Sequence, residues 1–264
     1  MSSAFLRDTA VEELGDGSYR GHISADWFTP RGANGGFLAA VVLRAIMAAE
    51  PDRERAPRSL TLHYLRPPAE GEVRISVVPE RRGGSVSTYS ARMEQDGRLC
   101  VLAIAALSQD FDSSLNYAPQ MPDVAPPNGL RSREGDATLP PIARRFRTQG
   151  AVGYAPFSGG PEALSGGWIA FDGDEPSPLD APALALLSDA WLPSMFVLVQ
   201  DFIGVPTIDL TIHFRARTEG LTGPALAIFR SRASAEGFFE EDGELWSQDG
   251  TLLAQSRQLG PVLG

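Results

Sequence analysis

A carboxylate inside an apolar run is the residue of this 264-residue chain whose setting first points to chemistry. Asp189 lies in the Ala/Leu-rich segment 181–199, which favours a helix. Its neighbours three and four residues away would be Ala185, Leu186, Leu192 and Pro193. A carboxylate among such neighbours loses hydration, so its pKa should rise and suit a general base near neutral pH. The pattern equally allows Asp189 to face solvent where Pro193 disturbs the helix.

A hydroxyl and an amide later in the chain could orient a water or a carbonyl. Thr207 follows Pro206 at the start of an expected strand, and its hydroxyl can both donate and accept. Gln258 lies on the last expected strand, where alternation puts it on the opposite face from Gln255. A buried Gln258 must find polar partners, and a held water is one of them. The bland alternatives are an ordinary strand threonine and a surface amide.

Three residues stand before an apolar helix that we expect over residues 36–49. Asn34 is a suitable N-cap, and Gly35 and Gly36 let a ligand approach the backbone closely. The N-terminus of a helix stabilises developing negative charge. Asn34, Gly35 and Gly36 are therefore candidate substrate-binding residues, and the competing interpretation is a simple entry into the helix.

What the sequence lacks excludes several chemistries. All 23 basic residues are Arg, and without Lys there is no Schiff-base, pyridoxal phosphate or P-loop chemistry. Cys100 is the only Cys, and the histidines His22, His63 and His213 do not stand at metal-ligand spacing. No Gly-x-Ser-x-Gly elbow is present. We expect neither a metal nor another cofactor, and the net charge of −10 argues against nucleic acid as a partner.

A weak internal repeat organises the elements that must position these residues. Ser59-Leu-Thr-Leu-His-Tyr64 aligns with Asp209-Leu-Thr-Ile-His-Phe214 at an offset of 150 residues. Gln95-Asp-Gly97 aligns with Gln248-Asp-Gly250 at an offset of 153. Each matched strand follows one of the two apolar helical segments, so the repeat indicates two copies of one unit. Chance similarity between two strand patterns is the alternative.

Alternating apolar residues predict nine strands around the two helices. They cover residues 19–24, 59–65, 72–79, 86–95, 99–109, 207–215, 225–232, 238–247 and 251–258. Asp96-Gly97 predicts a type I′ hairpin turn between two of them. The first helix is apolar on nearly every face, which is typical of a helix buried within a sheet. One helix per antiparallel meander predicts the α+β class.

A Pro-rich stretch separates the two copies. Residues 112–141 contain six prolines together with Asn and Ser, which favours an extended crossing linker. We therefore expect an N-terminal unit over 1–111, a linker over 112–141 and a C-terminal unit over 142–264. The N-terminal residues MSSAFLRDTAVEELGDG lack the pattern of a secretory signal, and no run of about 18 apolar residues predicts a membrane span. These features predict a cytoplasmic protein.

Three segments carry a resemblance to a known family. Leu187-Ser-Asp189, Pro206-Thr207-Ile-Asp209 and Leu253-Ala-Gln-Ser-Arg-Gln258 resemble the acyl-CoA thioesterase II family. The resemblance implies a double hotdog fold, with two long buried helices each wrapped by a curved antiparallel sheet. It also implies that Asp189, Thr207 and Gln258 are catalytic and hold the attacking water. Gln255 is a rival to Gln258 in that role.

The function that the resemblance implies is hydrolysis of acyl-CoA to free fatty acid and CoA, in a homo-oligomer of two or more chains. An enoyl-CoA hydratase of the same fold is an alternative. Similar hydratases carry a His five residues after the Asp, where this chain has Ser194. A non-catalytic acyl-CoA-binding protein is a further alternative, because an apolar tunnel can bind without turnover.

Overall fold

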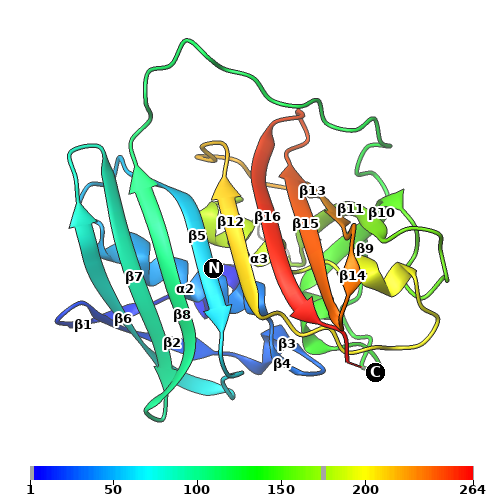
Figure 1. Ribbon diagram of the computed structural model, residues 1–264, viewed down its shortest axis with the longest axis horizontal. Helices are drawn as coiled ribbons and strands as arrows, with labels where there is room; N and C mark the ends of the chain where they lie inside the picture. Colours follow the sequence, from blue (N-terminus) through cyan, green and yellow to red (C-terminus); the bar gives the residue numbers. More distant parts are fainter. Residues whose placement is uncertain (1–2, 174–176, 264) are drawn as a thin grey trace.

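The computed structural model describes residues 3–173 and 177–263. Its main feature is a 14-stranded sheet in which every neighbouring pair of strands is antiparallel (Figure 1). In spatial order the sheet contains β1 (Glu12–Gly15), β2 (Ser18–Ile23), β6 (Gly71–Arg82), β7 (Val86–Gln95), β8 (Arg98–Ser108), β5 (Ala56–Tyr64), β12 (Asp209–Phe214), β16 (Leu252–Pro261), β15 (Phe238–Trp246), β13 (Ala225–Arg230), β11 (Leu164–Phe171), β10 (Phe146–Gly153) and β9 (Arg131–Ser132). β14 (Ser234–Ala235) pairs with β15, whereas β3 (Phe28–Thr29) and β4 (Gly32–Ala33) form a separate ribbon.

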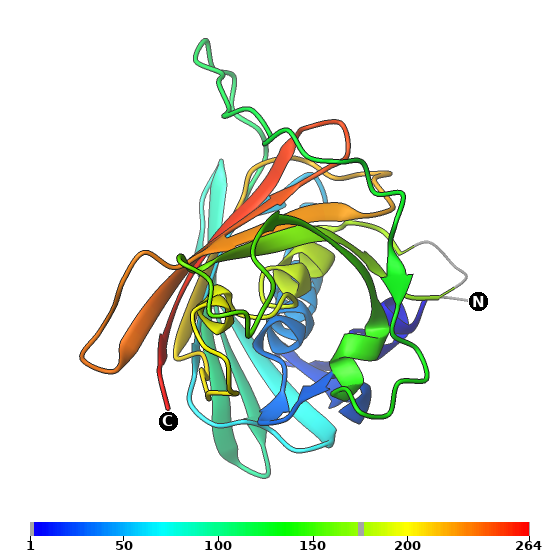
Figure 2. The ribbon, with the colours of Figure 1, turned by 90° about the vertical axis from the view of Figure 1, so that its right-hand side faces the viewer.

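The curved sheet encloses a helix that is apolar on almost every face. Figure 2 shows the helices surrounded by strands from both halves of the chain. α2 (Gly35–Ala49) has ten buried residues, of which nine belong to the main hydrophobic core. Asn34 caps it as expected, because its side-chain oxygen accepts from the Phe37 N–H at 2.9 Å. Burial within the sheet explains why α2 carries no polar stripe apart from Arg44.

The second helix is shorter than the sequence predicted. α3 (Ala181–Leu187) has seven residues, and the chain then turns before the 3-10 helix η3 (Ser194–Val197). The expectation of two long buried helices is therefore correct only for α2. The remaining helical segments are also short: α1 (Ala4–Asp8), η1 (Ala25–Trp27) and η2 (Pro141–Arg145).

The two copies of the repeat meet at the centre of the sheet. β5 pairs with β12 in antiparallel register, with Leu62 opposite Leu210 and Thr61 opposite Thr211. The two threonine hydroxyls lie 3.1 Å apart and share a hydrogen bond. They are separated by 150 residues, which is the offset of the sequence repeat. The repeat is thus a structural one, and its strands form the junction between the halves.

The predicted strands are all present, with ends shifted by up to three residues. The hairpin at Asp96-Gly97 is also as predicted, because both residues have positive φ angles of 50° and 71°. β10 and β11 were not predicted. Gly166 and Gly167 lie within β11 because the neighbouring strands approach closely there: a Cβ on Gly166 would lie 2.3 Å from the Ala227 oxygen, and one on Gly167 2.1 Å from the Gln149 oxygen.

The Pro-rich stretch crosses between the halves in Figure 1 and then packs. Met121, Val124 and Leu130 contact a small core around Trp168 and Leu226. The Trp168 indole N–H donates to the Ala125 oxygen at 2.7 Å. The stretch also contains β9. The prediction of an extended linker is therefore only partly correct, because the few apolar residues of the stretch pack against a hydrophobic surface on the C-terminal half.

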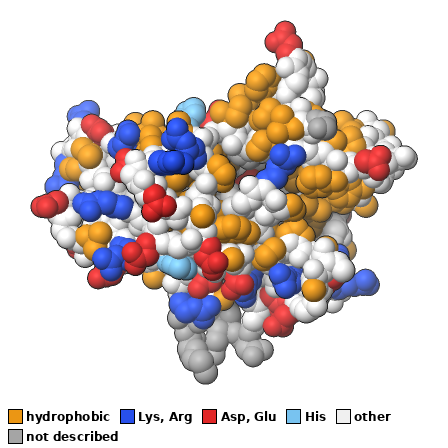
Figure 3. Space-filling view, turned by 90° about the horizontal axis from the view of Figure 1, so that it is seen from below, with side chains coloured by type: hydrophobic (Ala, Val, Ile, Leu, Met, Phe, Trp, Pro, Cys, Tyr) orange, Lys and Arg blue, Asp and Glu red, His pale blue; other side chains and the backbone are white. Residues whose placement is uncertain are grey.

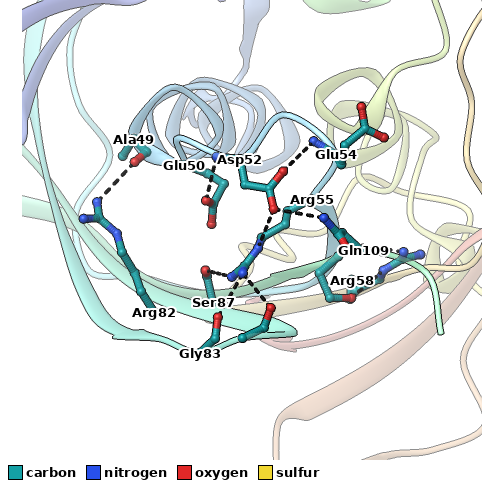
Figure 4. Close-up of polar contacts among 12 residues, drawn as sticks. Ala49, Glu50, Asp52, Glu54, Arg55, Arg58, Arg82, Gly83, Ser87 and Gln109 are labelled. Carbon is teal, nitrogen blue, oxygen red and sulfur yellow. Dashed lines mark hydrogen bonds and ion pairs between the residues drawn. The ribbon is translucent and has the colours of Figure 1, made fainter.

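An arginine fastens the chain just beyond α2 to the neighbouring hairpin (Figure 4). Arg55 pairs with Asp52 at 3.1 Å, donates to the oxygens of Gly83 and Gly84 at 2.9 Å each, and also bonds the Ser87 hydroxyl. Its side chain is 11% exposed. This contact fixes the end of α2 against the turn between β6 and β7.

The surface differs between the two halves. Seen from below, charged side chains of both signs cover the side of β6 to β8, and hydrophobic side chains gather on the opposite side (Figure 3). His63 and His213, at matched positions of the repeat, are both exposed on the outer face of the sheet. None of the described helices has the length and apolar character needed to cross a membrane.

Candidate active site

Asp189 lies two residues beyond the end of α3, and not inside a helix as predicted. In a continuing helix, the Asp189 carbonyl would accept from the N–H of residue 193, but Pro193 has none. The side-chain amide of Asn34 donates to this carbonyl instead, at 2.8 Å. The break in the helix thus brings Asp189 against the start of α2.

The Asp189 carboxylate is bound by the N-terminus of α2. Its Oδ2 accepts from Asn34 Nδ2 at 2.9 Å and from the Gly36 backbone N–H at 3.0 Å. The structure thus brings together Asp189 and the Asn34-Gly35-Gly36 triplet, which the sequence could not connect. The Gly36 N–H contacts a carboxylate of the protein itself, and this is a different use from the open oxyanion site that the triplet suggested.

Glycine is required at Gly36 by the close approach of the two helices. A Cβ there would lie 2.5 Å from the Leu186 oxygen and 3.0 Å from the Asp189 Cβ. A Cβ on Gly35 would lie 3.0 Å from Asp189 Oδ2 and 3.2 Å from the Tyr64 hydroxyl. The two glycines therefore allow backbone-level contact between α2 and the end of α3.

Tyr64 is a neighbour of the site that the sequence analysis missed. It ends β5, and its hydroxyl donates to the Gly35 oxygen at 2.8 Å. Burial raises the pKa of Tyr64 well above its ordinary value, and the nearby Asp189 charge raises it further. Alternation along β5 was the available signal, because Tyr64 lies on the same face as the buried Leu60 and Leu62.

Burial raises the pKa of Asp189 to about 7, and the negative charge of Glu241 adds to this rise. The hydrogen bonds from Gly36, Gly35 and Asn34 oppose it, because they stabilise the ionised form. A carboxyl with this pKa takes and releases a proton near neutrality, as a general base must.

Thr207 and Gln258 form a second group. The Thr207 hydroxyl donates to Gln258 Oε1 at 2.7 Å. Gln258 is buried on β16, whereas Gln255 pairs with the exposed His213 on the outer face, so Gln258 is the glutamine that faces inward. The residue after Thr207 is tied to Tyr64, because the Ile208 oxygen accepts from the Tyr64 N–H at 2.8 Å. Thr207 thus lies beside the end of β5, where Tyr64 contacts the residues around Asp189.

A buried glutamate completes this second group and was also missed by the sequence analysis. Glu241 accepts from Gln258 Nε2 at 2.8 Å and from the Ser194 N–H at 2.6 Å. Within residues 3–173 and 177–263, no hydrogen bond joins Asp189 directly to Thr207 or Gln258. Tyr64 links the two groups, because it bonds the Gly35 oxygen on one side and the Ile208 oxygen on the other. The charge of Glu241 also raises the pKa of Asp189.

The described residues contain no group of three or more His, Cys, Asp or Glu side chains arranged to hold a metal ion. The two groups together contain a carboxyl with a pKa of about 7, a second carboxyl, two amides and two hydroxyls. Such a set can position a water and accept its proton.

Comparison with solved structures identifies the class first. The chain has the hotdog fold, as a protein of unknown function from Alicyclobacillus acidocaldarius does, with 29% identity, a TM-score of 0.88 and coverage of 100% and 99% of the two chains. A protein proposed to be a thioesterase II from Thermobifida fusca follows at 25% identity and TM-score 0.85, covering 98% and 97%. The fold is shared with an acyl-CoA thioesterase II, TesB2, from Mycobacterium marinum at 22% identity, TM-score 0.77 and 98% coverage of both chains.

The family then follows from the sequence of each half. Residues 23–108 match the acyl-CoA thioesterase N-terminal domain, and residues 118–262 match the acyl-CoA thioesterase C-terminal domain. The chain belongs to the acyl-CoA thioesterase family. A search of curated proteins finds no match.

Proposed function

We propose that this chain is a double hotdog enzyme that hydrolyses acyl-CoA to a free carboxylic acid and CoA. The observation that carries the proposal is the buried Asp189 carboxyl, held by Asn34 and Gly36 and raised to a pKa of about 7, in a chain of the acyl-CoA thioesterase family. Asp189, Thr207 and Gln258 are the catalytic residues of this proposal.

The reaction proceeds by attack of water on the thioester carbonyl carbon. Asp189 accepts a proton from the water while the C–O bond forms, and collapse of the tetrahedral intermediate breaks the C–S bond. A Cys thiol has a reference pKa of about 8.5, and the alkyl thiol of CoA is of the same kind, so it leaves as thiolate with little acid assistance. This suits a site without Lys or His, and the proton taken by Asp189 is returned to solvent or thiolate.

Thr207 and Gln258 orient the attacking water in this scheme. Gln258 uses its oxygen for Thr207 and one amide hydrogen for Glu241, which leaves its second amide hydrogen for the water or the thioester carbonyl. Asn34, Gly35 and Gly36 border the bound substrate in this scheme. Asn34 and Gly36 act on it indirectly, because their hydrogen bonds hold the Asp189 carboxylate in place. A fixed carboxylate helps to align the water with the carbonyl carbon.

The proposal is tested by thiol release from acyl-CoAs of graded chain length. Asp189→Asn keeps the size of the side chain but removes the base, so we expect a loss of about 100-fold or more in kcat. Asp201→Asn is the matched control, since Asp201 is exposed on the same connection. Equal rates in wild type and Asp189→Asn would exclude the role of Asp189.

Two other outcomes would replace the proposed activity. Tight acyl-CoA binding by calorimetry without thiol release over hours would identify a non-catalytic acyl-CoA-binding protein. Water addition to crotonyl-CoA would identify a hydratase. We also propose that the enzyme acts in the cytoplasm and is a homo-oligomer of two or more chains. Light scattering coupled to size exclusion tests the oligomeric state, and the mass of a single chain would contradict it.

A further inference from the structure

Glu241 is a buried carboxylate whose role the proposed reaction does not explain. It lies on β15, is 3% exposed and stands directly opposite Gln258 in the strand register. No Arg or His of the described residues forms an ion pair with it. A buried carboxyl without a counter-ion is costly to a fold, and its retention calls for a compensating use.

Both oxygens of Glu241 accept hydrogen bonds from parts of the candidate site. Oε1 accepts from Gln258 Nε2 at 2.8 Å, and Oε2 accepts from the Ser194 N–H at 2.6 Å. Ser194 begins η3, on the connection that runs from Asp189 to Thr207. One side chain thus ties this connection to the strand that carries Gln258.

The hydrogen-bonding chemistry of Thr207, Gln258 and Glu241 shows how Glu241 sets the orientation of the Gln258 amide. A glutamine amide can lie in two orientations that exchange its oxygen and nitrogen, and the Thr207 hydroxyl accepts either because it can donate or accept. A carboxylate only accepts, so it selects the orientation with Nε2 toward Glu241 and Oε1 toward Thr207. The second Nε2 hydrogen then has a fixed direction.

We infer that Glu241 is a positioning residue that fixes the Gln258 amide for the thioester hydrolysis proposed above. The inference rests on that proposed function. Burial raises the pKa of Glu241, whereas the hydrogen bonds from Ser194 and Gln258 oppose the rise. Both N–H donors favour the ionised carboxylate, which is the form that only accepts.

Glu241→Gln tests the inference with the smallest change of shape. A Gln at 241 has one acceptor and one donor, so it cannot accept from both Ser194 and Gln258 in the present arrangement. We expect kcat to fall about 10- to 100-fold with KM within about threefold, because the water is misplaced while the substrate still binds. Glu244→Gln, on the outer face of the same strand, is the control and should keep wild-type kcat.

A double-mutant cycle separates positioning from a merely structural role. If Glu241 acts through Gln258, then Glu241→Gln should cause no further loss of kcat in a Gln258→Ala background. Full additivity of the two losses would overturn the inference. So would an unchanged kcat in Glu241→Gln while Asp189→Asn abolishes hydrolysis, and that result would leave the proposed function standing.

A readout without turnover keeps the inference testable if the variant does not fold or the wild type shows no hydrolysis. Nitrogen-15 NMR of the wild-type chain observes the Gln258 side-chain amide, assigned by its loss in Gln258→Ala. We expect the amide hydrogen bonded to Glu241 to be protected from exchange, at least tenfold more than those of exposed glutamines such as Gln120. Exchange as fast as at Gln120 would show that Glu241 does not hold the amide.

Discussion

At the scale of single residues, Asp189 combines a general-base pKa with hydrogen bonds that a charged carboxylate needs. The two effects act in opposite directions, and burial dominates. The apolar sequence neighbours of Asp189 predicted that its pKa is raised. It could not anticipate the donors, because Asn34 and Gly36 lie more than 150 residues earlier in the chain.

The pKa of Asp189 predicts the pH dependence of hydrolysis. The base must be deprotonated, so kcat/KM should rise with pH and reach half its plateau near pH 7, where half of Asp189 is ionised. The groups that face this carboxyl are Asn34, Gly36, Tyr64 and Glu241. Removing the Glu241 charge should move the half-point to lower pH. A profile of thiol release from pH 5 to 9 measures both, and a half-point near 4 would contradict the assignment.

Gly36→Ala predicts a combined loss of stability and activity. The added methyl lies within 2.5 Å of the Leu186 oxygen, so α2 and the end of α3 must separate. We expect urea unfolding to show a loss of about 1–3 kcal/mol, together with a fall in kcat as Asp189 loses its donor. Gly150→Ala is the control, because a Cβ there meets nothing within 4 Å and φ is not positive. Equal effects of the two changes would refute this explanation.

At the scale of elements, Pro and Gly residues explain which helices and strands could be predicted from the sequence. α2 was predicted well because its apolar run has no internal breaker before Pro51. The second segment has the same composition, but Pro193 removes the hydrogen bond that would carry the helix past Asp189. β11 was missed because Gly166 and Gly167 resemble a loop, although close strand approach requires them.

The Arg55 network predicts an element-scale change in stability. Arg55→Met keeps most of the side-chain length but removes the bonds to Asp52, Ser87 and two backbone oxygens. We expect a loss of about 1–3 kcal/mol in the free energy of unfolding, since hydrogen bonds to a charged donor are lost. Arg53→Met removes a single exposed bond to Met47 and should change the stability by less than about 0.5 kcal/mol. Hydrolysis should persist in both variants.

At the scale of the whole molecule, the repeat does not produce two equal sites. Asn34 and Asp180 cap the two helices alike, each accepting from the N–H three residues on. Asp189 stands nine residues after Asp180, and Leu43 stands nine residues after Asn34. Asp180 itself is paired with Arg44 at 3.0 Å. Counted from the caps, the first half has a leucine where the second has Asp189, and the cap that corresponds to Asn34 is held in an ion pair.

This asymmetry predicts one acyl-CoA site per chain. Asp189→Asn should bind acyl-CoA and hydrolyse it about 100-fold or more slowly than the wild type, and calorimetric titration of this variant should give one ligand per chain. A stoichiometry of two would show that the counterpart also binds. Asp201→Asn in the same background is the control. Asp201 is exposed, so the site is retained and the stoichiometry should be the same. A change at the buried Leu187 would not serve, because it opens the core.

The Thr61–Thr211 pair bears on ancestry. On a twofold axis a residue meets its own copy, and a contact from i to j is matched by one from j to i. His63 lies opposite Asp209 and His213 opposite Ser59, which are exchanged positions of the repeat. The chain therefore has the pattern of a symmetric dimer joined into one polypeptide. Covalent joining makes the pairing of the halves independent of protein concentration, and it frees each half to change alone. A carboxylate in one half and a leucine in the other is the kind of divergence that two separate identical chains could never acquire.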